Sequence, residues 1–165
     1  LARQLEALGG VASIVLTHRD DVADHARWAR TFGCERWIHT ADADAAPEAE
    51  HRLEGLEPFQ LAPNLQLIPT PGHTAGSLVA VLGTARQVLF SGDHLWWNPQ
   101  QQVVVASQRY CWWNWSEQLR SVERLLELDV AWLLPGHGHR HLFDAGQWRP
   151  ALEQTLAFSR RSPGS

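Results

Sequence analysis

Apolar residues fall into two patterns along the chain, and each pattern predicts one kind of element. Short continuous runs rich in Val, Leu and Ile are typical of buried strands. Stripes with apolar positions three and four residues apart predict amphipathic helices. The runs that predict strands are 11–16, 36–39, 65–68, 77–82, 87–90, 103–107 and 130–134. The expected helices are 1–8, 22–32, 115–126 and 147–158. Strands and helices that alternate in this way predict an α/β fold.

Polar and glycine residues mark where these elements end. Gly33 is expected to end the helix over 22–32, and Asp20 or Asp21 is expected to cap its first turn. The Asp- and Ala-rich segment 40–46 is expected on the surface, and 160–165 is expected to be a frayed tail.

Composition limits the kinds of partner. A chain of 165 residues with 44% hydrophobic content is expected to form one domain over 1–165. The net charge of −4 provides no basic field, so neither a nucleic acid nor an anionic membrane is expected as a partner. No apolar run approaches the ~20 residues of a membrane span. Cys34 and Cys111 are too few for a disulfide framework, so a reducing, cytoplasmic location is expected.

Histidine and aspartate gather in four short segments where an apolar run meets glycine or a polar turn. The segments are 16–25, 69–77, 89–94 and 133–139. Loops that follow strands can direct several side chains toward one point. Imidazole and carboxylate groups suit zinc, iron or manganese. The candidate metal ligands are His18, Asp20, Asp24, His25, His73, Asp93 and His137.

The order of these segments resembles the metallo-β-lactamase superfamily, whose signature is His-x-His-x-Asp-His, then Gly-His, Gly-Asp and a late Gly-His. The segment Thr-Pro-Gly-His-Thr-Ala-Gly-Ser at 70–77 is similar to the hydroxyacylglutathione-hydrolase pattern. The first segment departs from the signature. Asp20 replaces the second histidine, and two additional residues separate it from the Asp24-His25 pair.

The resemblance implies a four-layer αββα sandwich, and the chain is expected to lack the first strands of that fold. It also implies two divalent ions in a groove at one edge. His18, Asp20 and His73 would bind one ion, Asp24, His25 and His137 would bind the second, and Asp93 would bridge them. Zinc is the expected ion. Because the extra carboxylate of Asp20 makes the site one unit less positive than the histidine version, iron and manganese remain alternatives.

The implied chemistry is attack by a water that the ions have deprotonated. Asp24 is expected to orient this nucleophile, and His94 is a second catalytic candidate that would bond a ligand carboxylate or touch substrate. Arg140 is a candidate anion clamp. Trp97 is a candidate for an aromatic wall over the groove. Nine tryptophans in the chain also fit plain packing between layers, which is the favoured interpretation.

The function expected from the resemblance is metal-dependent hydrolysis of a small-molecule ester, thioester or lactone. A β-lactam is less expected because the first segment is altered, and nucleic-acid processing is disfavoured by the acidic balance. Two alternatives stay open. One is an iron-dependent oxidoreductase of the same fold, of the persulfide dioxygenase or flavodiiron kind, and the other is a non-catalytic domain. The sequence leaves the oligomeric state open.

Overall fold

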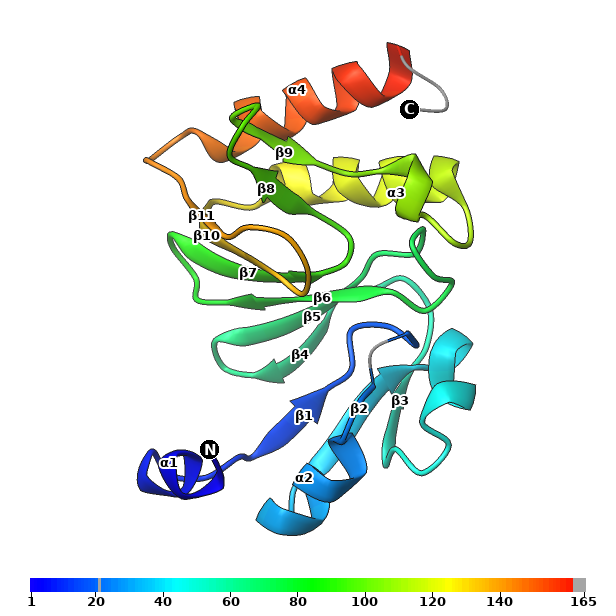
Figure 1. Ribbon diagram of the computed structural model, residues 1–165, viewed down its shortest axis with the longest axis vertical. Coiled ribbons are helices and arrows are strands. Elements are labelled where there is room, and N and C mark those ends of the chain that lie inside the picture. The colour runs from blue at the N-terminus through cyan, green and yellow to red at the C-terminus, as the bar shows by residue number, and fades with distance from the viewer. Residues whose placement is uncertain (21, 162–165) are drawn as a thin grey trace.

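Two sheets face each other between layers of helix (Figure 1). The structure is a computed structural model and describes residues 1–20 and 22–161. Helices α1 and α2 lie beside the smaller sheet, and α3 and α4 lie beyond the larger sheet at the other end of the molecule. The predicted α/β class and the layered αββα arrangement are confirmed.

The smaller sheet is parallel and has the order β1-β2-β3. Its strands are β1 (Ser13–Val15), β2 (Glu35–His39) and β3 (His51–Leu53). Helix α1 (Ala2–Ala7) precedes the sheet, α2 (His25–Phe32) connects β1 to β2, and the 3₁₀ helix η1 (Thr40–Ala45) connects β2 to β3. Gly33 ends α2 in the left-handed conformation (φ 63°), as its position in the sequence predicted.

The larger sheet has the order β11-β10-β7-β6-β5-β4. Its strands are β4 (Phe59–Ala62), β5 (Leu65–Pro69), β6 (Leu78–Leu82), β7 (Gln87–Gly92), β10 (Val130–Pro135) and β11 (His141–Leu142). Strand β10 is parallel to β7, whereas the pairs β5–β6 and β6–β7 are antiparallel. Strands β5, β7 and β10 therefore run in the same direction, and their carboxyl ends lie at the same edge.

Helices and a short hairpin cover the outer face of the larger sheet. They are β8 (Trp96–Asn98), β9 (Val103–Val105), η2 (Gln108–Tyr110), α3 (Trp115–Arg124), η3 (Leu125–Glu127) and α4 (Trp148–Arg161). The main core lies beneath them and includes Val79, Leu89, Val122, Leu133 and Leu152. On the inner face, Leu53 of β3 packs against Leu67, Leu78 and Ala80 of the larger sheet. This contact holds the two sheets together.

Some local predictions are wrong. The helix predicted from residue 22 begins at His25, because Ala23 has a left-handed backbone (φ 42°) that a helix does not accommodate. The segment 40–46, expected on the surface, is partly buried: Asp42 is 0% and Ala46 is 0% exposed. Asp42 is buried by hydrogen bonds to the loops of Arg19 and Thr74, and Ala46 packs in a cluster with Leu16 and Ile38.

Among residues 1–20 and 22–161, no helix combines the length and apolarity that crossing a bilayer would require. Helix α4 continues through Arg161, so the predicted fraying of 160–161 is wrong, and 162–165 lie outside the described residues.

Candidate metal centre

The predicted ligands stand on loops that follow β1, β5, β7 and β10. The last three strands end at the same edge of the larger sheet, so their loops start as neighbours. Backbone hydrogen bonds connect the loops further. The amide of Leu78 donates to the carbonyl oxygen of Thr17 (2.8 Å), and that of Gly136 donates to Gly92 (2.8 Å). The first bond attaches the loop after β1 to β6, so the smaller sheet delivers its ligands to the same place.

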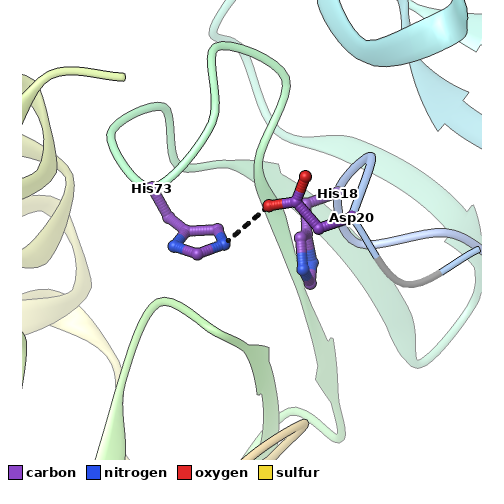
Figure 2. Close-up of side chains that lie close together, drawn as sticks. All are labelled: His18, Asp20 and His73. Atoms are coloured by element: carbon purple, nitrogen blue, oxygen red, sulfur yellow. Dashed lines mark ion pairs between the residues drawn. The ribbon is translucent and has the colours of Figure 1, made fainter. Parts of the chain in front are cut away.

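His18, Asp20 and His73 lie together at this edge, as Figure 2 shows. Their potential ligand atoms all lie within 4.8 Å of one another. The Nε2 atom of His73 is 3.3 Å from a carboxylate oxygen of Asp20. The two imidazole rings meet edge to face, with centroids 4.9 Å apart and an interplanar angle of 84°.

Asp93 and His137 complete the group. The Oδ2 atom of Asp93 is 3.6 Å from Nε2 of His18 and 3.9 Å from Nε2 of His73. The Nδ1 atom of His137 is 2.8 Å from Oδ1 of Asp93. Asp93 is mostly buried, whereas the His137 side chain is 71% exposed and lies at the mouth of the site. Segments far apart in the chain thus converge on the Asp93 carboxylate.

The spacing of three of these atom pairs suits ligands of a shared ion. Ligand atoms held at 2.0–2.2 Å from a tetrahedral ion lie about 3.3–3.6 Å from one another. The His73–Asp20 and His18–Asp93 pairs, at 3.3 and 3.6 Å, match this spacing, and the His73–Asp93 pair at 3.9 Å is slightly wider.

Both imidazoles at this point are buried, and His73 offers it a lone pair. The Nδ1 atom of His73 lies 2.6 Å from the carbonyl oxygen of Tyr110, and because a carbonyl only accepts, Nδ1 carries the proton and Nε2 of the neutral ring is left as an acceptor. Burial lowers the pKa of His18, an effect that the nearby Asp93 carboxylate partly opposes. Among the described residues, neither Nε2 atom has a hydrogen-bond partner. A buried ring nitrogen without a hydrogen-bond partner is costly, and a divalent cation bound to both Nε2 atoms would relieve that cost.

Glycine is required beside the ligands. Gly92 precedes Asp93 and has a left-handed backbone (φ 51°), and a Cβ atom there would lie 2.8 Å from Oγ1 of Thr17. A Cβ on Gly136, which precedes His137, would lie 2.9 Å from Oδ1 of Asp93. The Gly-Asp and Gly-His pairs seen in the sequence therefore allow two loops to approach closely.

A buried aspartate that the sequence did not single out connects the loops of His18 and His73. The Asp42 carboxylate accepts hydrogen bonds from the amide of Arg19 (3.0 Å), the hydroxyl of Thr74 (2.5 Å) and the amide of Gly76 (3.0 Å). Arg19 and Thr74 each directly follow a candidate ligand. The only sequence signal was that Asp42 lies in a segment otherwise rich in alanine, which was assigned to the surface.

An aromatic pocket opens onto the metal ligands. It has a volume of about 400 Å³ and is lined by His73, Asp93, Trp96, Tyr110, Trp112, His137 and Gly138. Trp112 and Trp113, which precede α3, are fixed to the ligand His73. Their backbone amides both donate to the carbonyl oxygen of His73 (2.9 and 3.1 Å). A larger cavity of about 620 Å³ between β9 and α4 has no histidine or carboxylate in its described lining.

Trp97 does not line this pocket, so its predicted role in substrate binding is wrong. Its side chain is 8% exposed, stacks on His141 with centroids 3.7 Å apart, and meets Phe143 edge to face. Because side chains alternate along a strand, Trp96 faces the pocket and Trp97 faces the core. The packing interpretation, which the sequence favoured, is correct for Trp97.

The other two candidates near the site are placed differently from each other. His94 is 2% exposed, and burial lowers its pKa to about 3. Neither ring nitrogen has a hydrogen-bond partner among the described residues, so the structure does not show the predicted bond to a ligand carboxylate. A contact of His94 with substrate stays a prediction. Arg140 is exposed on the loop after His137. Its role as an anion clamp stays a prediction.

Comparisons with known proteins address the fold. No family model matches the chain. Curated relatives include proteins described as uncharacterized from Mycobacterium tuberculosis (strain ATCC 25618 / H37Rv) and Mycobacterium bovis. Each is 27% identical, over 86% of this chain and 76% of the relative.

Similar solved structures are metallo-β-lactamases and related proteins. The BLEG-1 B3 metallo-β-lactamase has a TM-score of 0.65 at 20% identity, over 85% of this chain and 76% of that one. A metallo-β-lactamase from Pontibacter korlensis has a TM-score of 0.66 at 18% identity, over 98% and 75%. This chain has the metallo-β-lactamase fold. A metallo-β-lactamase family protein from Thermus thermophilus also matches, with a TM-score of 0.66 at 20% identity, over 97% of this chain and 65% of that one.

Within this metallo-β-lactamase fold, Asp24 and His25 lie apart from the other predicted ligands. The Asp24 side chain is 70% exposed and its carboxylate is 4.0 Å from Arg27. The His25 ring is buried, with its nitrogens near Arg36 and Glu48. The structure therefore does not support Asp24 and His25 as ligands of this centre, or Asp24 as the residue that orients the nucleophile. Asp21, one of the two candidate caps of α2, lies outside the described residues.

Proposed function

We propose that this protein is a metal-dependent hydrolase of a small-molecule ester, thioester or lactone. The observation that carries the proposal is the convergence of two buried imidazole Nε2 atoms, which lack any described donor, on the carboxylates of Asp20 and Asp93. Two imidazoles and two carboxylates are the ligand types that zinc, iron or manganese takes.

The ion would be held by His18, Asp20, His73 and Asp93, with His137 at the exposed side. When bound, such an ion acidifies a coordinated water toward neutral pH and polarises a carbonyl oxygen. Two contacts within the protein position the ligands for such an ion. The Tyr110 carbonyl fixes the His73 tautomer, and the buried Asp42 holds the two ligand loops in register.

The pocket supports a substrate with an apolar or planar portion. Three aromatic rings, from Trp96, Tyr110 and Trp112, line it beside the ligands. The described residues that line it include no lysine or arginine, so they provide no countercharge for an anionic substrate group. An uncharged acyl or leaving group that stacks on these rings fits better than a highly charged one.

Iron-dependent oxidation is a second candidate, and one observation favours it. His18, Asp20 and His73 form a group of two imidazoles and one carboxylate, which is the ligand combination of many non-haem iron oxygenases. This candidate predicts iron in protein purified in air, and oxygen uptake in the presence of a thiol or persulfide.

Hydrolysis of a panel of aryl esters, aryl thioesters and lactones by the full chain, before and after chelation and metal return, tests the proposal. We expect metal-dependent turnover that His73→Ala abolishes. The matched control is His51→Gln, which removes an imidazole that contacts Glu35 and Trp37 away from the site and is expected to retain full turnover. Turnover that survives both chelation and His73→Ala would contradict a metal-dependent hydrolase.

A further inference from the structure

We propose that this centre holds one metal ion, because the Asp24-His25 pair that would form a second position is built into the support of the smaller sheet. The inference rests on the proposed function for the first ion. Of the ligands that the resemblance implied for a second ion, the structure leaves only His137 and the bridging Asp93 near the site, and these two contact each other.

His25 is directed into a buried ion-pair network. Its ring is 8% exposed at the start of α2. Its Nδ1 atom is 3.4 Å from Nη1 of Arg36, and its Nε2 atom is 3.7 Å from a carboxylate oxygen of Glu48. Both ring nitrogens of His25 could bind a metal, but one faces Arg36 of β2 and the other faces Glu48 of the loop before β3.

The guanidinium of Arg36 is held in place beside the His25 ring. Arg36 is 7% exposed and donates from Nε and Nη2 to the two carboxylate oxygens of Glu50 (3.0 and 2.6 Å). Its Nη2 also donates to the backbone carbonyl of Glu48 (2.6 Å). These bonds hold the guanidinium beside the His25 ring, so the Nδ1 atom of His25 faces a fixed hydrogen-bond donor of β2.

Asp24 cannot compensate for the loss of His25. It stands at the N-cap of α2, its side chain is 70% exposed, and its carboxylate faces Arg27 on the surface at 4.0 Å. A lone exposed carboxylate binds a divalent ion weakly because water competes for both partners. Asp24 and His25 therefore both have their contacts away from the centre.

The metal content of the full chain, stripped with a chelator, returned to excess zinc and freed of loose ions by gel filtration, tests the inference. We expect one zinc per chain. Asp24→Ala and His25→Gln are expected to retain one zinc, whereas His73→Ala retains none. Because His25→Gln disturbs a buried network, Asp24→Ala, which removes only an exposed carboxylate, keeps the test decisive if His25→Gln fails to fold.

The remaining outcomes distinguish the single-ion inference from the proposed function. Two zinc ions per wild-type chain, or loss of one ion in Asp24→Ala, would overturn the single-ion inference and leave the proposed hydrolase standing. No tightly bound zinc, iron or manganese in the wild-type chain would overturn both. The measured quantity is ions per chain, so the test does not depend on finding the substrate.

Discussion

Replacing Asp42 with asparagine separates loop positioning from metal binding itself. The carboxylate is fully buried and accepts three hydrogen bonds, from Arg19, Thr74 and Gly76. An amide keeps only one acceptor oxygen, so its NH₂ group must face at least one donor. The Thr74 hydroxyl has a second partner in Ser77 Oγ at 2.8 Å, but the buried Gly76 amide has no alternative among the described hydrogen bonds.

The expected magnitude follows from that inventory. One buried amide left without an acceptor costs about 1–3 kcal/mol, so Asp42→Asn is expected to lower the free energy of unfolding by about 2 kcal/mol. Because Asp42 connects the residues that follow His18 and His73, the metal site should loosen as well. Loss of such a supporting contact lowers metal affinity by roughly 10–100-fold.

The assay is a zinc competition titration against a chromophoric chelator, together with urea unfolding of the metal-free protein. Asp44→Asn is the matched control, because Asp44 lies in the same 3₁₀ helix but is 65% exposed and forms its ion pair with the exposed Arg19 side chain. We expect that control to change the free energy of unfolding by less than about 0.5 kcal/mol. A folded Asp42→Asn protein with wild-type zinc affinity would refute the positioning role.

Three further experiments have distinct expected results. Trp112→Ala should raise KM with little change in Tm, because Trp112 is 67% exposed in the pocket. Trp97→Ala should lower the free energy of unfolding by about 3–5 kcal/mol, because Trp97 is buried in the core. The reverse pattern in kinetic and thermal measurements would contradict the assignment. Asp20→His should raise zinc affinity relative to manganese, and parallel titrations with an unchanged ratio would argue against the charge reasoning. The Arg36 hydrogen bonds lower the pKa of Glu50 to about 2, so the stability they give is present at neutral pH and is lost as pH falls through the acid range toward 2. Glu50→Gln should make the urea midpoint of unfolding depend less on pH over that range. A pH dependence as steep as that of the wild type would count against this reasoning.

Much of the centre could be predicted from the sequence because its ligands follow local rules. Buried strands appear as apolar runs, and the turns after them need glycine where two loops approach closely, as at Gly92 before Asp93. His18, His73 and Asp93 could therefore be placed on loops at strand ends, and the parallel course of β5, β7 and β10 brings two of those loops to one edge.

What the sequence could not determine is which polar side chains these loops bury. Asp42 looked like a surface residue by composition, yet the loops of His18 and His73 close over it and supply its donors. Trp96 and Trp97 are adjacent and chemically identical, and only the register of β8 on the core decides which one reaches the pocket.

His25 is a further case in which tertiary packing decided the role of a residue. The residue type and its place after Asp24 suggested a ligand, but its partners are Arg36 and Glu48, which come from elsewhere in the chain. Local pattern determines where a strand ends and which residue types follow it, because those depend on neighbouring backbone and burial. The partner of a buried charge depends on which distant segments pack around it, and that is decided only when the two sheets come together.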